Sequence, residues 1–96
     1  MKCTFIVYNI AIHAEILEAL KKAGLRDYTR WEEVVGVGKK SGPHMNTHIW
    51  PAKNSAMIIM AEEKKTALLM EEIRELQDKM KDVGLKAFCL AVDECA

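Results

Sequence analysis

Two short segments of similar sequence, Lys22-Ala23-Gly24-Leu25-Arg26 and Asp82-Val83-Gly84-Leu85-Lys86, decide the fold. Each follows a stretch in which apolar residues recur every three or four positions, as in an amphipathic helix, and each precedes an apolar run typical of a strand. Glycine accepts the positive φ that commonly ends a helix, so we expect the helices to stop at Gly24 and Gly84. The chain therefore contains the same helix-to-strand junction twice.

Four strands and two helices are expected around these junctions. The strands are predicted at residues 3–8, 28–37, 55–61 and 86–92, and the helices before Gly24 and before Gly84. The order β-α-β-β-α-β in so short a chain is typical of an α+β, ferredoxin-like sandwich, with a four-stranded antiparallel sheet and two helices on one face. We expect a single domain over residues 1–96.

The third predicted strand is apolar on both of its faces. Met57 and Ile59 point one way, and Ala56, Ile58 and Met60 point the other. Because the two helices cover only one face of such a sheet, something else must cover the second face. The sequence predicts self-association through that face, and the alternative is an edge segment that folds back over it.

The composition excludes several classes of protein. Acidic and basic side chains balance at 14 each, which argues against nucleic-acid binding and against a polybasic membrane surface. The three cysteines, Cys3, Cys89 and Cys95, form no CxxC pair, and the first two fall in apolar runs where cysteine acts as a small hydrophobe. With no signal-peptide pattern and no apolar run long enough to span a membrane, we expect a cytoplasmic protein that does not insert into membranes.

The connection between the second and third strands is too long for a hairpin. It runs from Gly36 to Asn54, whereas hairpins usually need about two to five loop residues. Gly36 and Gly38 alternate at the strand end, and Lys39 and Lys40 follow them. Backbone N–H groups at glycines can approach an anion closely, and lysines add positive charge, so these residues are candidates for an anion site. The alternative is a strand end with a bulge.

The same loop holds two of the three histidines. His44 and His48 have the spacing of a two-ligand metal site, although Gly42 and Pro43 argue against a helix there. Two ligands are too few for a closed site, so a third would come from another loop or subunit. The alternative is two solvated or hydrogen-bonding histidines.

Two further ring side chains receive different interpretations. Trp50 precedes a proline and should be extended, which suits a stacking or docking surface, although it could equally pack. His13 is interpreted as a surface residue without a role.

No enzyme motif occurs in the chain. There is no nucleophile elbow, P-loop or HExxH. Glu32 and Glu33 are neighbours on a strand, so they point to opposite faces and cannot act as a carboxylate pair from one chain. We therefore predict that the protein is not an enzyme.

With this element order and this glycine-containing loop, the chain resembles the PII superfamily of signalling proteins, in particular a PII-like subfamily of nitrogen-regulatory type. The resemblance covers nearly the whole chain. Its motifs are Tyr28-Thr29-Arg30-Trp31-Glu32-Glu33-Val34, Gly36-Val37-Gly38, Ser41-Gly42-Pro43-His44, Thr47-His48-Ile49-Trp50-Pro51 and Asn54-Ser55.

The resemblance implies an assembly and a ligand class. PII proteins form trimers, bind small effectors, often adenine nucleotides, in clefts between subunits, and dock on transporters or enzymes through a loop called the T-loop. Gly36, Gly38, Lys39 and Lys40 match the start of the T-loop, where PII proteins contact nucleotide phosphates. Lys53 matches the lysine at the far base of that loop.

The chain departs from the PII pattern at its second phosphate loop. The connection 83–86 is too short for the glycine-rich loop that PII proteins have there, and no basic residues follow the last strand. We therefore expect adenine nucleotides to bind weakly or not at all, and a small anion or a divalent metal to be at least as suitable an effector.

Together these observations predict a homotrimeric PII-like regulator that senses a small effector through the loop 36–53 and controls a partner protein such as a membrane transporter or an enzyme. The first alternative is a divalent-metal-binding protein resembling the CutA group, and the second is an enzyme with a site between subunits. The predicted ligand-binding residues are Gly36, Gly38, Lys39, Lys40, His44, Trp50 and Lys53, and the predicted metal ligands are His44 and His48.

Overall fold

The computed structural model describes residues 1–36 and 53–96. Its elements follow the predicted order, which confirms the ferredoxin-like fold. They are β1 (Lys2–Asn9), a short 3-10 helix η1 (Ile10–Ile12), α1 (His13–Lys22), β2 (Thr29–Val34), β3 (Asn54–Ala61), α2 (Glu63–Lys79) and β4 (Leu85–Ala91).

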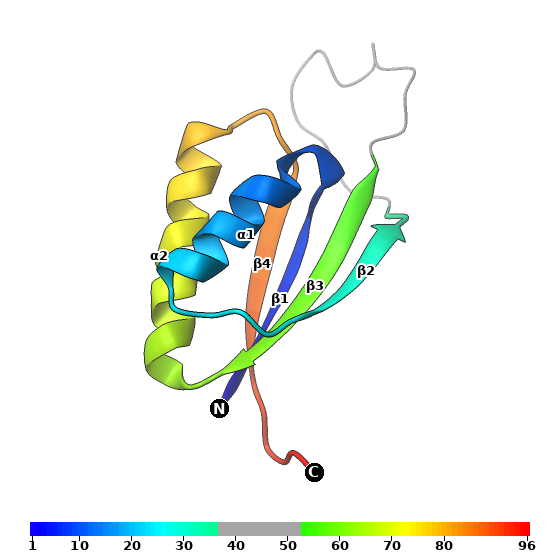
Figure 1. Ribbon diagram of the computed structural model, residues 1–96. Helices are drawn as coiled ribbons and strands as arrows, with labels where there is room; N and C mark the ends of the chain where they lie inside the picture. Colours follow the sequence, from blue (N-terminus) through cyan, green and yellow to red (C-terminus); the bar gives the residue numbers. More distant parts are fainter. Residues whose placement is uncertain (37–52) are drawn as a thin grey trace.

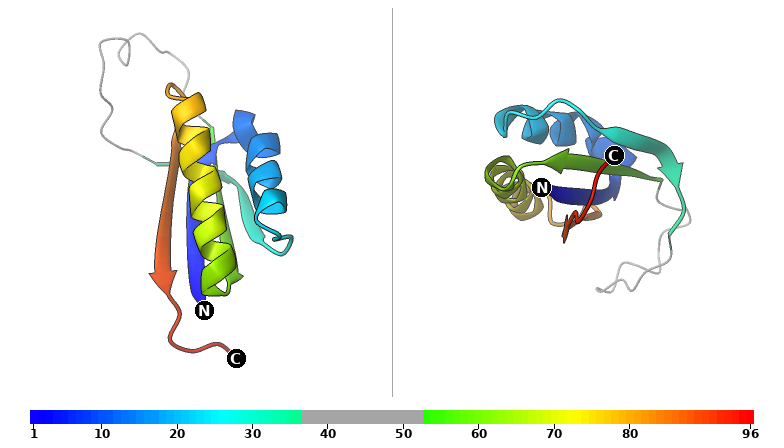
Figure 2. Two further views of the ribbon diagram at one scale, coloured as in Figure 1. Left: turned by 90° about the vertical axis from the view of Figure 1, so that its left-hand side faces the viewer. Right: turned by 90° about the horizontal axis from the view of Figure 1, so that it is seen from below.

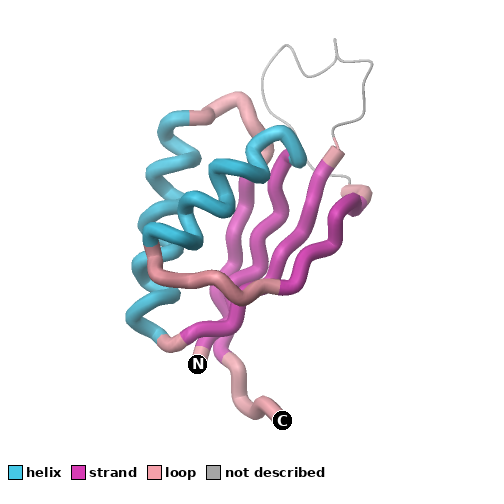
Figure 3. Tube along the Cα trace, viewed as in Figure 1, coloured by secondary structure: helices cyan, strands magenta, loops and turns pink. Residues whose placement is uncertain are grey.

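The four strands form one antiparallel sheet in the order β2-β3-β1-β4. Both helices lie on the same face of this sheet (Figures 1 and 3), and a view along the sheet shows the two layers (Figure 2). The two termini lie at one end of the sheet, where the Val92 N–H donates to the Met1 carbonyl at 3.2 Å. The end of β2 and the start of β3 lie at the opposite end (Figure 1).

The core lies between the helices and the strand residues that point toward them. On β3, Met57 and Ile59 are fully buried there, as their alternation in the sequence predicts. The apolar stripes of the helices cover them with Ile16 and Leu20 from α1 and Leu69 from α2.

The two sequence-related junctions have different structures. Gly24 has φ +76°, and the N–H of Leu25 donates to the Leu20 carbonyl at 2.9 Å, which is the Schellman arrangement predicted from the glycine. The second helix, in contrast, ends at Lys79, several residues before Gly84, and Gly84 has no positive φ. The prediction that Gly84 stops this helix is therefore wrong. The intervening residues form a turn that delivers Leu85 to the core.

The face of the sheet away from the helices carries exposed apolar side chains. The strand register places Phe5 beside Ile58 and Phe88, and Cys3 beside Met60 and Leu90, all on this open face. Its large exposed members are Trp31 (48 %), Met60 (47 %), Phe88 (54 %) and Leu90 (50 %). Within residues 1–36 and 53–96, no segment folds back over this face, since these side chains stay exposed.

The cysteines partly follow the sequence prediction. All three are free thiols, and Cys3 is half-buried on the open face. Cys89 is exposed although it falls in an apolar run, because β4 is an edge strand, with no strand of the described residues on its outer side.

Candidate functional site

Both ends of the predicted effector loop are anchored at the same end of the sheet. Val34 of β2 pairs with Asn54 of β3, and the N–H of Ile10 donates to the Lys53 carbonyl at 2.9 Å. The N–H of Asn9 donates to the Gly84 carbonyl at 2.9 Å, so the connection before β4 reaches the same end. The structure therefore brings the loop base, the start of η1 and the connection before β4 together.

Only two of the predicted site residues belong to the described part of the chain. Gly36 and Lys53 mark the two ends of the loop, and both are exposed. A Cβ added at Gly36 would meet no described atom within 4 Å, so packing does not require glycine there. The other predicted residues, Gly38, Lys39, Lys40, His44, His48 and Trp50, lie outside the described residues.

Next to the loop base lies a polar cluster formed by Tyr8, His13, Arg30, Ser55 and the Glu32 carbonyl. The Tyr8 hydroxyl lies 2.7 Å from His13 Nδ1, and the two rings stack with centroids 5.8 Å apart. Arg30 Nη2 donates to Ser55 Oγ at 3.0 Å, and Ser55 Oγ donates to the Glu32 carbonyl at 2.6 Å. The cluster therefore joins β1, the start of α1, β2 and β3.

The strand β2 makes this cluster possible through an irregular register. The pairing with β3 shifts between Trp31 and Val34, so a bulge lies beside Glu32 and Glu33. The regular pairing of residues 29–31 with β3 does not continue unchanged to Val34. The Ser55 hydroxyl binds the Glu32 carbonyl at this irregular stretch of the ladder.

The electrostatics of the cluster fix its protonation. Burial lowers the pKa of His13 below its ordinary 6.5, and the nearby positive charge of Arg30 lowers it further, while Glu32 has a smaller, opposite effect. Burial also raises the pKa of Tyr8, and the charge of Arg30 offsets this in part. At neutral pH the phenol is therefore protonated and His13 is neutral, and the tautomer of His13 decides which of the two groups donates in the hydrogen bond between them.

Arg30 is incompletely satisfied in this environment. Its Nε is buried and has no hydrogen-bond partner among the described residues. Its acceptors among the described residues are neutral hydroxyls, that of Ser55, which accepts from Nη2, and that of Tyr8. The guanidinium therefore has donor capacity and positive charge to spare.

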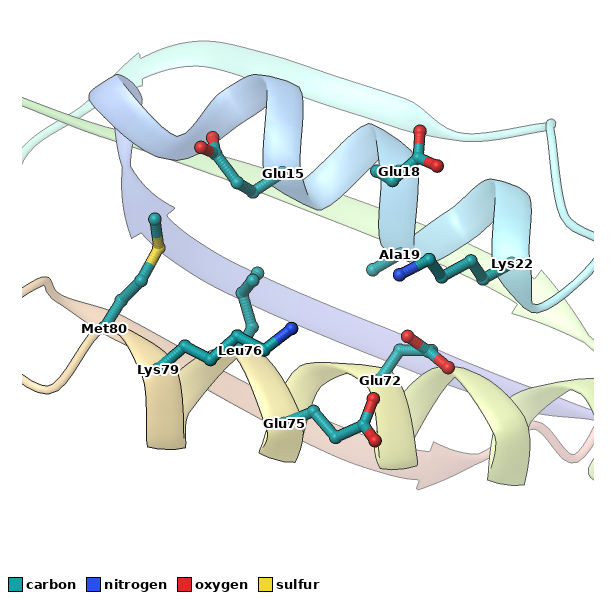
Figure 4. Close-up of a pocket in the computed structure, with 9 residues that line it drawn as sticks. All are labelled: Glu15, Glu18, Ala19, Lys22, Glu72, Glu75, Leu76, Lys79 and Met80. Atoms are coloured by element: carbon teal, nitrogen blue, oxygen red, sulfur yellow. The ribbon is translucent and has the colours of Figure 1, made fainter.

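Away from the polar cluster, a hollow lies between the two helices (Figure 4). Glutamates and lysines from both helices surround its apolar floor of Ala19 and Leu76, and Lys22 and Glu72 lie opposite one another across it. A row of exposed charged side chains over an apolar floor is ordinary for the groove between two packed helices, so this hollow does not indicate a binding site. Across residues 1–36 and 53–96, no three His, Cys, Asp or Glu side chains are grouped to hold a metal ion.

Sequence reasoning missed the polar cluster. The interpretation of His13 as a surface residue without a role is wrong, because His13 is half-buried and bound to Tyr8. The available signal was a set of polar residues, Tyr8, Arg30 and Ser55, at strand positions that point toward the helices. These residues contact one another only because of the strand register, which could not be predicted from the sequence.

Comparison of the sequence with known protein families identifies the family of this chain. The sequence model of the family described as nitrogen regulatory protein P-II matches residues 1–96. The chain belongs to the P-II family. P-II proteins are regulatory signalling proteins, so the predicted resemblance is confirmed and the family is not one of enzymes. No curated protein sequence matches the chain.

Solved structures that share the fold of this P-II protein include two PII-like proteins. One is a PII-like signalling protein (TTHA0516) from Thermus thermophilus, at 17 % identity and a TM-score of 0.66, covering 92 % of this chain and 82 % of the other. The other is CPII, a nitrogen regulatory PII-like protein from Thiomonas intermedia K12 bound to ADP, AMP and bicarbonate, at 16 % identity and a TM-score of 0.67, covering 97 % and 88 %. In the described part of the chain, no helix is long and apolar enough to cross a membrane.

Proposed function

We propose that this P-II protein is a non-catalytic, cytoplasmic homotrimer that senses a small effector through the loop 36–53 and controls a partner protein such as a transporter or an enzyme. The observation that carries the proposal is the P-II family match over residues 1–96. The position of the loop ends also supports the proposal. Both ends lie beside the polar cluster, so a ligand bound at the loop base would contact strands that hydrogen bonds already join.

The open face of the sheet supports the trimer. Its exposed apolar side chains, with Phe88 and Leu90 half accessible or more, are neighbours on one face of the sheet, and a contiguous exposed apolar patch marks an interaction surface. Burying the same face of three copies against one another would remove them from water. Oligomerisation also adds core to a chain that is short for a stable domain.

The similar structure of CPII and the charges of this chain both favour an anionic effector. CPII binds ADP, AMP and bicarbonate, so an anionic ligand is a suitable effector for a protein of the same fold. Lys39 and Lys40 provide positive charge beside Gly36 and Gly38, and Lys53 provides it at the other loop base. We expect bicarbonate or another small anion to bind more readily than ATP, because the connection 83–86 is too short for a second phosphate loop.

Calorimetry on the native protein with bicarbonate, AMP, ADP and ATP tests this proposal. A Lys39→Gln/Lys40→Gln double variant should lose most of the binding enthalpy. A Lys21→Gln/Lys22→Gln double variant, which removes two exposed lysines from the last turn of α1, should bind as the native protein does. The proposal falls if none of these ligands binds, or if the two double variants bind equally well.

The two loop histidines offer a separate test of metal against anion. A zinc site should weaken as the pH falls through about 6.5, since imidazole binds metal only when neutral, whereas an anion clamp should strengthen. Zinc and phosphate affinities are measured on either side of that pH for the native protein and for a His44→Ala/His48→Ala variant. The CutA-like metal-binding alternative is not favoured by the family match, and a histidine-dependent zinc affinity that falls at low pH would revive it.

A further inference from the structure

The polar cluster contains a cation that lacks an anion. Arg30 is half-buried, its Nη2 donates to the hydroxyl of Ser55, and its Nε is buried without a described partner. A guanidinium offers five N–H donors, and a charged donor without an acceptor is costly when it is removed from water. Such a group is stabilised most by an oxyanion, whose paired oxygens match the arginine fork.

The groups that the structure describes around Arg30 do not supply that oxyanion. Tyr8 is protonated at neutral pH, Ser55 is a neutral alcohol, and His13 is neutral. Among the described residues, the carboxylate that raises the pKa of His13 is that of Glu32, whose side chain is exposed and whose effect on His13 is the smallest of the three causes. The segment 37–52, which follows β2, contains no Asp or Glu in its sequence, so it cannot contribute a carboxylate.

We propose that Arg30 is the primary binding residue for a small oxyanion, with the Ser55 hydroxyl holding the guanidinium in place and the neutral Tyr8–His13 pair beside it. The ligand chemistry is a planar or tetrahedral oxyanion, such as bicarbonate or the phosphate of a nucleotide. This inference rests on the proposed effector-sensing function, and it assigns the recognition to a strand residue outside the loop 37–52. The residue lies on the same strand whose end starts that loop.

The position of Arg30 connects ligand binding to the loop base. Arg30 and the Glu32 carbonyl both bind the Ser55 hydroxyl, which lies two residues after Lys53 on the strand that follows the loop. An anion that drew Nη2 away from Ser55 would weaken the chain from Arg30 through Ser55 to Glu32. The bulged part of β2, directly before Gly36, would then lose one of its attachments to β3.

The test uses the side-chain Nε–H resonance of Arg30 in the full-length native protein. Bicarbonate, inorganic phosphate and AMP are titrated separately while this resonance and the binding enthalpy are recorded. We expect the resonance to shift with saturation, and the anion affinity to fall at least about tenfold in Arg30→Gln, the size of effect expected for a charge-assisted hydrogen bond. Arg26→Gln is the matched control, since Arg26 is an exposed arginine in the connection between α1 and β2.

Two further variants separate this inference from the proposed function. Arg30→Lys keeps the positive charge but loses the paired N–H donors of the guanidinium, so it should keep part of the anion affinity. It also serves as a control in case Arg30→Gln fails to fold. If the Lys39→Gln/Lys40→Gln variant loses anion binding while Arg30→Gln binds like the native protein, the inference is overturned and loop sensing stands. If no anion shifts the Arg30 resonance at all, the inference is overturned by the native protein alone. Binding of AMP without bicarbonate or phosphate would identify the nucleotide as the source of the oxyanion.

Discussion

Replacing Phe88 by aspartate should dissociate the assembly without unfolding the chain. Phe88 lies on the open face of β4 and is 54 % exposed in the single chain. An aromatic side chain presents about 200 Å² in all, so about 100 Å² of Phe88 is left to be buried by a partner. At about 25 cal/mol per Å², this area contributes about 2.5 kcal/mol per subunit, and about 7.5 kcal/mol over a trimer.

A loss of that size corresponds to about a 10⁵-fold change in the dissociation constant of the trimer, because each 1.4 kcal/mol is a factor of about ten. The carboxylate adds a desolvation penalty to the loss of apolar area. Sedimentation velocity at micromolar concentration should therefore show a trimer for the native protein and a monomer for Phe88→Asp. Far-ultraviolet circular dichroism should be the same for both, since the side chain lies outside the helix-covered core.

Leu68→Asp is the matched control. Leu68 is 45 % exposed, but it belongs to α2 in the helical layer, away from the open face. This variant should sediment like the native protein. If Leu68→Asp dissociates the assembly as strongly as Phe88→Asp does, or if the native protein is monomeric throughout, the reasoning about the open face is refuted.

Three further predictions concern the fold and the cluster. Ile59→Asp puts a charge at a side chain that is 1 % exposed and should lower the free energy of unfolding by more than about 3 kcal/mol in urea titrations, and a stable variant would contradict the core assignment. Gly24→Ala should lower it by about 1 kcal/mol because of the positive φ, whereas Gly84→Ala should change little, and equal effects would argue against the Schellman arrangement. The pKa of His13 is lower in the folded chain, so the unfolded chain takes up the proton first, and the free energy of unfolding should fall below about pH 6.5 until the folded pKa is passed. His13→Gln should remove that part of the pH dependence. If the free energy of unfolding depends on pH in the same way for the native protein and for His13→Gln, the assigned role of His13 is excluded.

The sequence predicts the fold well because the fold depends on periodicity. Apolar spacing placed both helices and all four strands, and the glycine at position 24 ends α1 as expected from its backbone freedom. The boundaries were less predictable. The strand β2 ends at Val34 and not at Val37, and α2 ends at Lys79, because tertiary contacts decide where each element stops.

The candidate site was predictable only in part. A long connection with glycines, lysines and histidines drew attention to residues 36–53, and the structure places both ends of that connection beside the polar cluster. The cluster itself depends on residues far apart in the chain, such as Tyr8 and Arg30, that meet only through strand register and a bulge. A half-buried histidine cannot be told from an exposed one at the start of a helix until the neighbouring strand is in place.

The pairing of Val34 with Asn54 has a consequence for how this protein could diversify. The ladder and the bond from Ile10 to Lys53 hold the two loop ends together whatever lies between them. Since each doubling of loop length costs only about 0.6 kcal/mol in closure entropy, insertions and deletions between these anchors should scarcely affect the stability of the sheet. The loop can therefore change in length as well as in residue while the strands beneath it, with Arg30 and Ser55 among their residues, keep their positions.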